Sequence, residues 1–217
     1  MAVTTWKEEF EVRLRVVNWN KLNHAYGKAG DVPDLLLQLL EPERFEGAMY
    51  QVWGNLYHQG SRYEATSVAV PFLVELLEHL SQGRAEMVNY LVAIALGDPT
   101  SFYPFGFRRG LPKGDDESDD FEDELYERVQ ASAFPIFLRL SGGEVELKTQ
   151  KMALWSLGWF PERENESRSV LEESNVSAAH FALEMLDNAK QPMRARSEEE
   201  EERDFDEFEE RISEIFE

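Results

Sequence analysis

Four histidines and a large excess of carboxylates are the side chains with which this chain could do chemistry. His24 could act as a general base only if a carboxylate and a nucleophile met at its ring, and nothing in the surrounding sequence brings them together. His79 and His180 lie within helical patterns, where a catalytic or ligand role is not expected. The chain contains no cysteine, which excludes thiolate chemistry and cysteine-based zinc sites. We therefore predict no cofactor, no metal and no enzymatic activity.

The carboxylates are concentrated in two segments. Residues 197–217 carry twelve acids and two arginines, residues 113–124 carry eight acids and one lysine, and the rest of the chain keeps only −4 of the net charge of −21. The run 115–120 lacks the alternating ligands, the sixth-position glycine and the closing glutamate of an EF-hand loop. A flexible run also cannot hold the fixed carboxylate separation that glycoside hydrolysis requires. Both segments are interpreted as solvated charge.

This charge distribution limits the partners. A phosphate backbone would be repelled, and no basic stripe compensates elsewhere, so direct binding of nucleic acid is not expected. A basic protein would be attracted instead. The charged N-terminal segment is unlike a signal peptide and no apolar run has the length of a membrane span, so a cytoplasmic protein without membrane contact is expected. The oligomeric state is not predicted.

The elements that would position these side chains are predicted to be helices. Pro33, Pro71 and Pro135 each lie in an apolar stripe that is followed by a second amphipathic stretch. Such repetition is typical of stacked helix pairs that share one core. We predict an all-α fold, an α-solenoid of about four antiparallel helix pairs between an N-terminal and a C-terminal helix. The expected helices cover 5–26, then 31–40 with 44–57, 63–80 with 84–96, 123–141 with 144–159, and 167–173 with 176–189.

Two segments interrupt or follow this pattern. Residues 1–196 are expected to form a single domain, with an insert at 97–123 that is rich in glycine, proline, aromatic and acidic residues. Residues 197–217 form an acidic tail in which apolar residues recur at helical spacing, so an amphipathic helix is predicted there. Its apolar stripe consists of Phe205, Phe208, Ile212, Ile215 and Phe216.

Three short sequences resemble HEAT and HEAT-like repeats. Residues 148–158, Lys-Thr-Gln-Lys-Met-Ala-Leu-Trp-Ser-Leu-Gly, are similar to the second helix of such a repeat, and residues 93–97, Ala-Ile-Ala-Leu-Gly, repeat its ending. Residues 57–66, which lead into the Pro71 segment, resemble a group of uncharacterised bacterial HEAT-repeat proteins. The resemblance extends over residues 22–173. It implies an α-solenoid and no particular partner, because solenoids serve many unrelated functions.

The strongest candidate contact residues lie at the junction between two predicted pairs. His58, Arg62, Tyr63 and Glu64 form a polar cluster there, on an edge where solenoids often hold a partner. The alternative is that these side chains cap helices and connect neighbouring repeats.

Aromatic residues are the second group of candidates. Trp155 and Trp159 lie on a predicted second helix, where exposed tryptophans would anchor a partner and buried ones would be core. The insert adds Phe105, Phe107, Arg108 and Arg109, which would form an interaction lid or fold back onto the solenoid.

These observations favour a non-catalytic scaffold or adaptor that binds another protein. One alternative is an immunity or antitoxin-like protein that neutralises a basic toxin through acidic patches. Another is an enzyme on a helical-repeat scaffold, such as a chromophore lyase.

Overall fold

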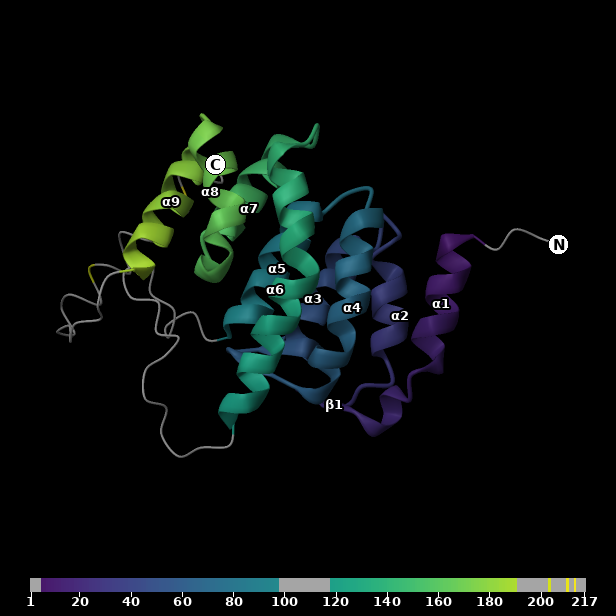
Figure 1. Ribbon diagram of the computed structural model, residues 1–217. Coiled ribbons are helices and arrows are strands. Elements are labelled where there is room, and N and C mark those ends of the chain that lie inside the picture. The colour runs from purple at the N-terminus through teal and green to yellow at the C-terminus, as the bar shows by residue number, and fades with distance from the viewer. Residues whose placement is uncertain (1–4, 98–117, 191–202, 204–209, 211–212, 214–217) are drawn as a thin grey trace. The chain divides into compact units, whose positions relative to one another are not determined.

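The computed structural model describes residues 5–97, 118–190, 203, 210 and 213. Most of these residues are helical and the described strands form only two short β-hairpins, which agrees with the predicted all-α class (Figure 1). The chain divides into two compact units, Met1–Gly97 and Asp98–Glu217, here called unit 1 and unit 2. Each unit is described by itself. None of the helices in the described ranges combines the length and apolar character needed to cross a bilayer.

The described part of unit 1 contains five α-helices, a 3₁₀ turn and the two hairpins. The predicted helix at 84–96 is present with the same bounds, those at 44–57 and 63–80 are one residue shorter at each end, and the one at 31–40 is shorter still. The elements in chain order are α1 (Trp6–Val16), η1 (Trp19–Lys21), β1 (Asn23–His24), β2 (Gly27–Lys28), α2 (Val32–Gln38), α3 (Phe45–Leu56), β3 (Tyr57–His58), β4 (Ser61–Arg62), α4 (Glu64–His79) and α5 (Arg84–Leu96).

The predicted leading helix at 5–26 is wrong beyond Val16. Thr5 and Glu8 form a capping box that begins α1, but the backbone is extended at Val17 and the chain then enters η1 and the β1–β2 hairpin. Trp19 fits the apolar pattern because it is buried, and its indole N–H donates to the Leu14 carbonyl at 2.7 Å. The apolar residues therefore point inward as expected, although the backbone that carries them is not one helix.

Helix α1 is fixed to α4 at one end. The Trp6 ring stacks on His79 with centroids 3.6 Å apart, and its indole N–H donates to Glu75 at 2.6 Å. Arg13 also pairs with Glu75. Burial opposes ionisation of Glu75, but the hydrogen bonds from Arg13 and Trp6 outweigh it and lower the pKa of this carboxyl. Together with the edge-to-face contact of the buried Phe10 ring with Phe72, the Trp6–His79 stack and the Glu75 carboxylate with its two donors attach α1 to α4.

Helices α3 and α5 meet through Tyr90, which is fully buried. Its hydroxyl donates to the Val52 carbonyl at 3.0 Å, and its ring lies edge-to-face with Trp53 at 4.7 Å. The hydrogen bond satisfies a polar group that would otherwise be costly to bury. The core of unit 1 therefore contains one specific polar contact between these two helices.

Unit 2 contains α6 (Ser118–Gly142), α7 (Leu147–Leu157), η3 (Pro161–Arg163), α8 (Glu164–Glu173) and α9 (Ser177–Ala189). Helices are thus present at both predicted pairs, and Pro135 lies inside α6 as expected. Phe160 is completely buried and centres an aromatic cluster in this unit. The rings around it are Tyr126, Phe134 and Phe137.

Most of the insert and the tail lie outside the described residues. This applies to residues 98–117 and to all of 197–217 except Arg203, Glu210 and Ser213, which are helical. The predicted apolar stripe of the tail therefore stays a prediction.

Gly83 provides a test of the packing in unit 1. It is the N-cap of α5 with a φ of 73°, and a Cβ added there would overlap the buried ring of Phe45. Gly83→Ala should lower the free energy of unfolding by about 2 kcal/mol or more, because the left-handed conformation and the displaced ring both cost energy. Chemical denaturation of the full chain measures the change.

Gly47, inside α3, is the matched control. No atom of the described residues lies within 4 Å of a Cβ built at this position. Gly47→Ala should raise the free energy of unfolding by about 1 kcal/mol, since alanine has the higher helix propensity. Similar destabilisation by both substitutions would contradict the packing described for Phe45.

Candidate functional site

Both β-hairpins lie at the C-terminal end of α3. In the first, Asn23 pairs with Lys28 and His24 with Gly27, and in the second, Tyr57 pairs with Arg62 and His58 with Ser61. Strand β3 continues directly from α3, and the first hairpin is attached by the Ala25 N–H, which donates to the Asn55 carbonyl at 3.0 Å. Side chains from separate parts of the chain are thereby brought to one end of a helix.

His24 fixes the first hairpin with both of its ring nitrogens. Its Nδ1 accepts the Tyr26 backbone N–H at 3.0 Å, so the proton is on Nε2, which donates to Asp31 at 2.9 Å. The second Asp31 oxygen accepts from the Asn55 side chain at 2.8 Å. A carboxylate therefore does meet the buried imidazole, but neither ring nitrogen is left to take a proton from a substrate. The arrangement positions Tyr26.

Tyr26 lies over the last turns of α3 and is 68% exposed. Its Cε2 is 3.8 Å from a Cβ built at Gly54, so the ring covers the glycine in ordinary van der Waals contact. Its hydroxyl is 3.3 Å from Nδ1 of His58, and the two rings meet edge-to-face at 5.4 Å. His58 thus contacts the ring of Tyr26 from the second hairpin.

From Gly47 onward the outward face of helix α3 carries no charge. Tyr50 on this face is 82% exposed, and no charged residue occurs between positions 47 and 61 although 30% of the chain is charged. This helix face and the ring of Tyr26 from the β1–β2 hairpin form one surface, which we call the tyrosine face. It consists of Tyr26, Gly47, Tyr50, Gln51 and Gly54. The opposite side of α3 is buried through Phe45, Ala48, Met49, Val52 and Leu56.

Arg62, a predicted contact residue, holds the C-terminal end of α5. Its Nη1 donates to the carbonyls of Ile94 at 3.1 Å and Ala95 at 3.3 Å, and Tyr57 donates to the Gly97 carbonyl at 2.6 Å. Carbonyls of a last helical turn lack partners within the helix, and a cation is favourable there. The cross-strand pair of Tyr57 and Arg62 therefore caps α5, which is the structural alternative given for this cluster.

The other members of the predicted cluster lie at the start of α4. Tyr63 is the N-cap residue, and its N–H donates to the Thr66 hydroxyl at 2.9 Å. Glu64 accepts from the Asn23 side chain at 3.2 Å. Of the four predicted residues, His58 is the one for which a direct contact with the tyrosine face is described.

Trp155 and Trp159 lie in the core of unit 2. They are 6% and 3% exposed, and their rings meet edge-to-face at 5.5 Å. The Trp159 carbonyl accepts the Tyr126 hydroxyl at 3.1 Å. Both tryptophans are therefore core residues in this structure, which is the second of the two roles considered for them. The insert residues Phe105, Phe107, Arg108 and Arg109 lie outside the described residues.

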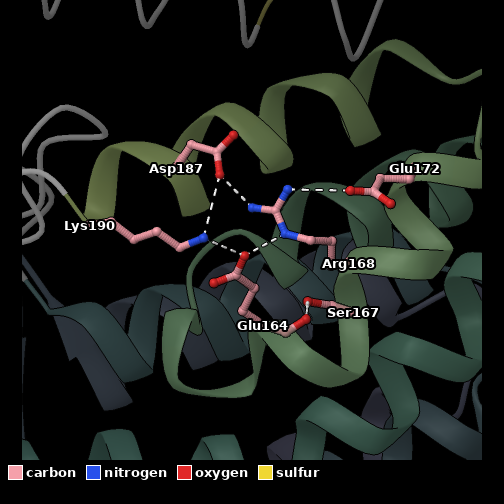
Figure 2. Close-up of polar contacts among 6 residues, drawn as sticks. All are labelled: Glu164, Ser167, Arg168, Glu172, Asp187 and Lys190. Atoms are coloured by element: carbon pink, nitrogen blue, oxygen red, sulfur yellow. Dashed lines mark hydrogen bonds and ion pairs between the residues drawn. The ribbon is translucent and has the colours of Figure 1, made fainter.

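Unit 2 also carries a dense cluster of charges, which Figure 2 shows. Arg168 of α8 pairs with Glu164, Glu172 and Asp187, and Lys190 contacts Glu164 at 2.7 Å. The hydrogen bond from Lys190 lowers the pKa of the Glu164 carboxyl, burial opposes this effect, and Arg168 adds to the lowering. Since these charges neutralise one another across α8 and α9, the cluster connects two helices.

Comparisons with protein-family models, curated proteins and solved structures give no match to this chain. Within the ranges that the structure describes, no three histidine, aspartate or glutamate side chains gather as metal ligands would. The site is therefore described from its own geometry. Tyr26 and Tyr50 are not among the residues predicted from the sequence. The uncharged stretch at 47–61, in which Tyr50 falls outside the buried apolar set, is the signal that could have identified Tyr50, whereas nothing in the sequence places Tyr26 beside it.

The charge cluster gives a prediction with a defined pH dependence. Glu164→Gln should lower the stability at about pH 7 by about 1 kcal/mol, because charge-assisted hydrogen bonds are lost. The pKa of Glu164 lies below its ordinary value of 4.5 in the folded protein, so this stabilisation is present above pH 4.5 and is lost as the pH falls through the lower native value. The difference between variant and parent should shrink on acidification, as measured by denaturation at several pH values.

Glu172→Gln is the matched control on the same helix. Its side chain is 57% exposed and lies 3.4 Å from Arg168, so the expected change is below about 0.5 kcal/mol. If Glu172→Gln lowered the stability as much as Glu164→Gln, the contacts of Glu164 would not contribute more to stability than an exposed ion pair.

Proposed function

We propose that this protein is a non-catalytic protein–protein interaction scaffold and that the tyrosine face is a surface on which it holds another protein. The observation that carries the proposal is the pair of exposed rings, Tyr26 and Tyr50, on an uncharged helix face of a strongly charged chain. The centres of protein interfaces are depleted of charge and enriched in tyrosine. Such residues frequently supply most of the binding energy.

The rigidity of the face supports the same proposal. The backbone at Tyr26 is fixed by His24 and Asp31, and its ring is placed between Gly54 and His58. A surface that is already ordered loses less conformational entropy on binding than a flexible loop. The polar side chains around it act to preorganise the contact.

We further infer that the helix pairs are HEAT-like repeats of an α-solenoid. The support is that helices adjacent in sequence pack together in each predicted pair, α2 with α3 and α4 with α5 in unit 1, and α6 with α7 and α8 with α9 in unit 2. Pro71 and Pro135 lie inside the first helix of their pairs, as the resemblance implies. Holding partners on exposed ridges is a common use of such repeats.

Site-specific photocrosslinking tests the proposal in the native cell. A photoreactive amino acid at position 50, and separately at position 26, should yield a crosslink to one and the same protein. Tyr50→Ala should reduce the product formed from position 26 at least about tenfold, because loss of an interface tyrosine typically costs more than about 1.4 kcal/mol. Since Tyr50 is 82% exposed, the melting temperature should change little.

Val16 on α1 is the control position, because it is 79% exposed but lies on a different helix. It should give no such product. The proposal would be contradicted by the same product from position 16, or by the absence of any discrete product from positions 50 and 26.

A further inference from the structure

Two carboxylates border the tyrosine face near the start of α3. Glu43 and Glu46 are exposed, and no cation among the described residues pairs with either, since Arg44 contacts Glu41 at 3.6 Å. An acidic side chain in the first turn of a helix interacts favourably with the helix dipole, which accounts for Glu46 at this position. Glu46 precedes Tyr50 by one helical turn, so its charge lies directly beside the exposed ring.

The same face leaves the backbone of α3 open at Gly47, and one turn beyond Tyr50 the Tyr26 ring covers it at Gly54. No described atom lies within 4 Å of a Cβ built at Gly47, and the nearest at Gly54 belongs to Tyr26 at 3.8 Å. The two positions are seven residues apart, which is about 10 Å along the helix axis. Each glycine costs about 1 kcal/mol relative to alanine inside a helix. A strip of low side-chain relief thus runs past the exposed ring of Tyr50, from the open Gly47 to the Tyr26 ring that covers Gly54.

Building on the proposed function, we propose that the tyrosine face receives an α-helix of a basic protein. The helix packs along α3 with a small or apolar side chain over Gly47 and with its next turn against the Tyr26 ring that covers Gly54, while lysine or arginine side chains meet Glu43 and Glu46. The rings of Tyr26 and Tyr50 contact its apolar face. Helices pack at axis distances of about 8–10 Å, and small residues at the crossing allow the shorter distances.

The charge of the chain selects this occupant over two others. A net charge of −21 attracts a basic protein from solution, whereas a second copy of this chain carries the same charge and is repelled. Nucleic acid is repelled for the same reason and offers no apolar surface to the tyrosines. Within a basic protein, the segment that fits is one with an apolar side for the uncharged centre of the face and with lysine or arginine side chains for its acidic border.

Two synthetic amphipathic helical peptides test the inference on the isotope-labelled full-length protein. They are about 18 residues long, or five turns, with identical leucine and alanine faces and with polar faces made of either lysine or glutamate. The lysine peptide should shift the backbone amide signals of Gly47 and Gly54 in nuclear magnetic resonance spectra. The glutamate peptide should need at least about a tenfold higher concentration for the same shifts.

Charge-matched variants separate this site from the acidic segments elsewhere. Glu43→Lys combined with Glu46→Lys should weaken the lysine-peptide effect at Gly47 and Gly54 at least about tenfold. Glu9→Lys combined with Glu173→Lys makes the same change in net charge on exposed positions outside the face and should have little effect there. Gly47→Leu should block the site while the fold stays as stable as the parent, because the position is open.

The inference would be overturned by equal shifts from both peptides, by unmoved Gly47 and Gly54 signals, or by equal weakening in the two charge variants. A dimer that Tyr50→Ala dissociates, detected by sedimentation, would assign the face to a second copy instead. If positions 50 and 26 crosslink to a natural partner whose contact is acidic or non-helical, the scaffold function stands and this inference fails.

Discussion

The attachment of the β1–β2 hairpin to α3 is the constraint on which the tyrosine face depends. It relies on one neutral imidazole that uses both nitrogens, with Asp31 shared between His24 and Asn55. A buried polar group of this kind stabilises a structure only when all its partners are in place. Without this network the hairpin would keep the Ala25–Asn55 backbone bond, but the backbone at Tyr26 would lose its partner and the ring would be placed less well on the face.

The helices could largely be predicted from the sequence because their signals are local. Proline positions, N-cap residues and apolar spacing identified the segments that became α3 to α9, and Pro71 and Pro135 lie inside helices as expected. The first hairpin could not be predicted in this way. Its geometry depends on the contact of His24 with Asp31, seven residues away, and of Asp31 with Asn55, which is 24 residues further along the chain. The apolar pattern through Trp19 fits a helix equally well.

The candidate site was predicted less well, for a related reason. A sequence shows which residues are polar or aromatic, and the structure decides which of them are already occupied. Arg62 caps α5, Trp155 and Trp159 fill a core, and Arg168 joins two helices. Tyr50, by contrast, lies in the uncharged stretch at 47–61 with nothing that marks it as a contact residue except its exposure. Arg62, Trp155 and Trp159, which were predicted as contact residues, have structural contacts, whereas Tyr50, which was not predicted, carries the proposal.

The buried Tyr90 between α3 and α5 has a consequence for the behaviour of unit 1 in alkaline solution. Burial, with a smaller contribution from Tyr57, raises the pKa of Tyr90 well above its ordinary value of 10.0. The phenol is thus kept neutral in the folded chain at a pH where it would ionise in the unfolded one, and stability falls as the pH rises past that point. Deprotonation would also remove the donor to Val52, behind the helix that carries Tyr50. At alkaline pH, the contact between α5 and the buried side of α3 should therefore weaken, although the tyrosine face lies on the opposite side of α3.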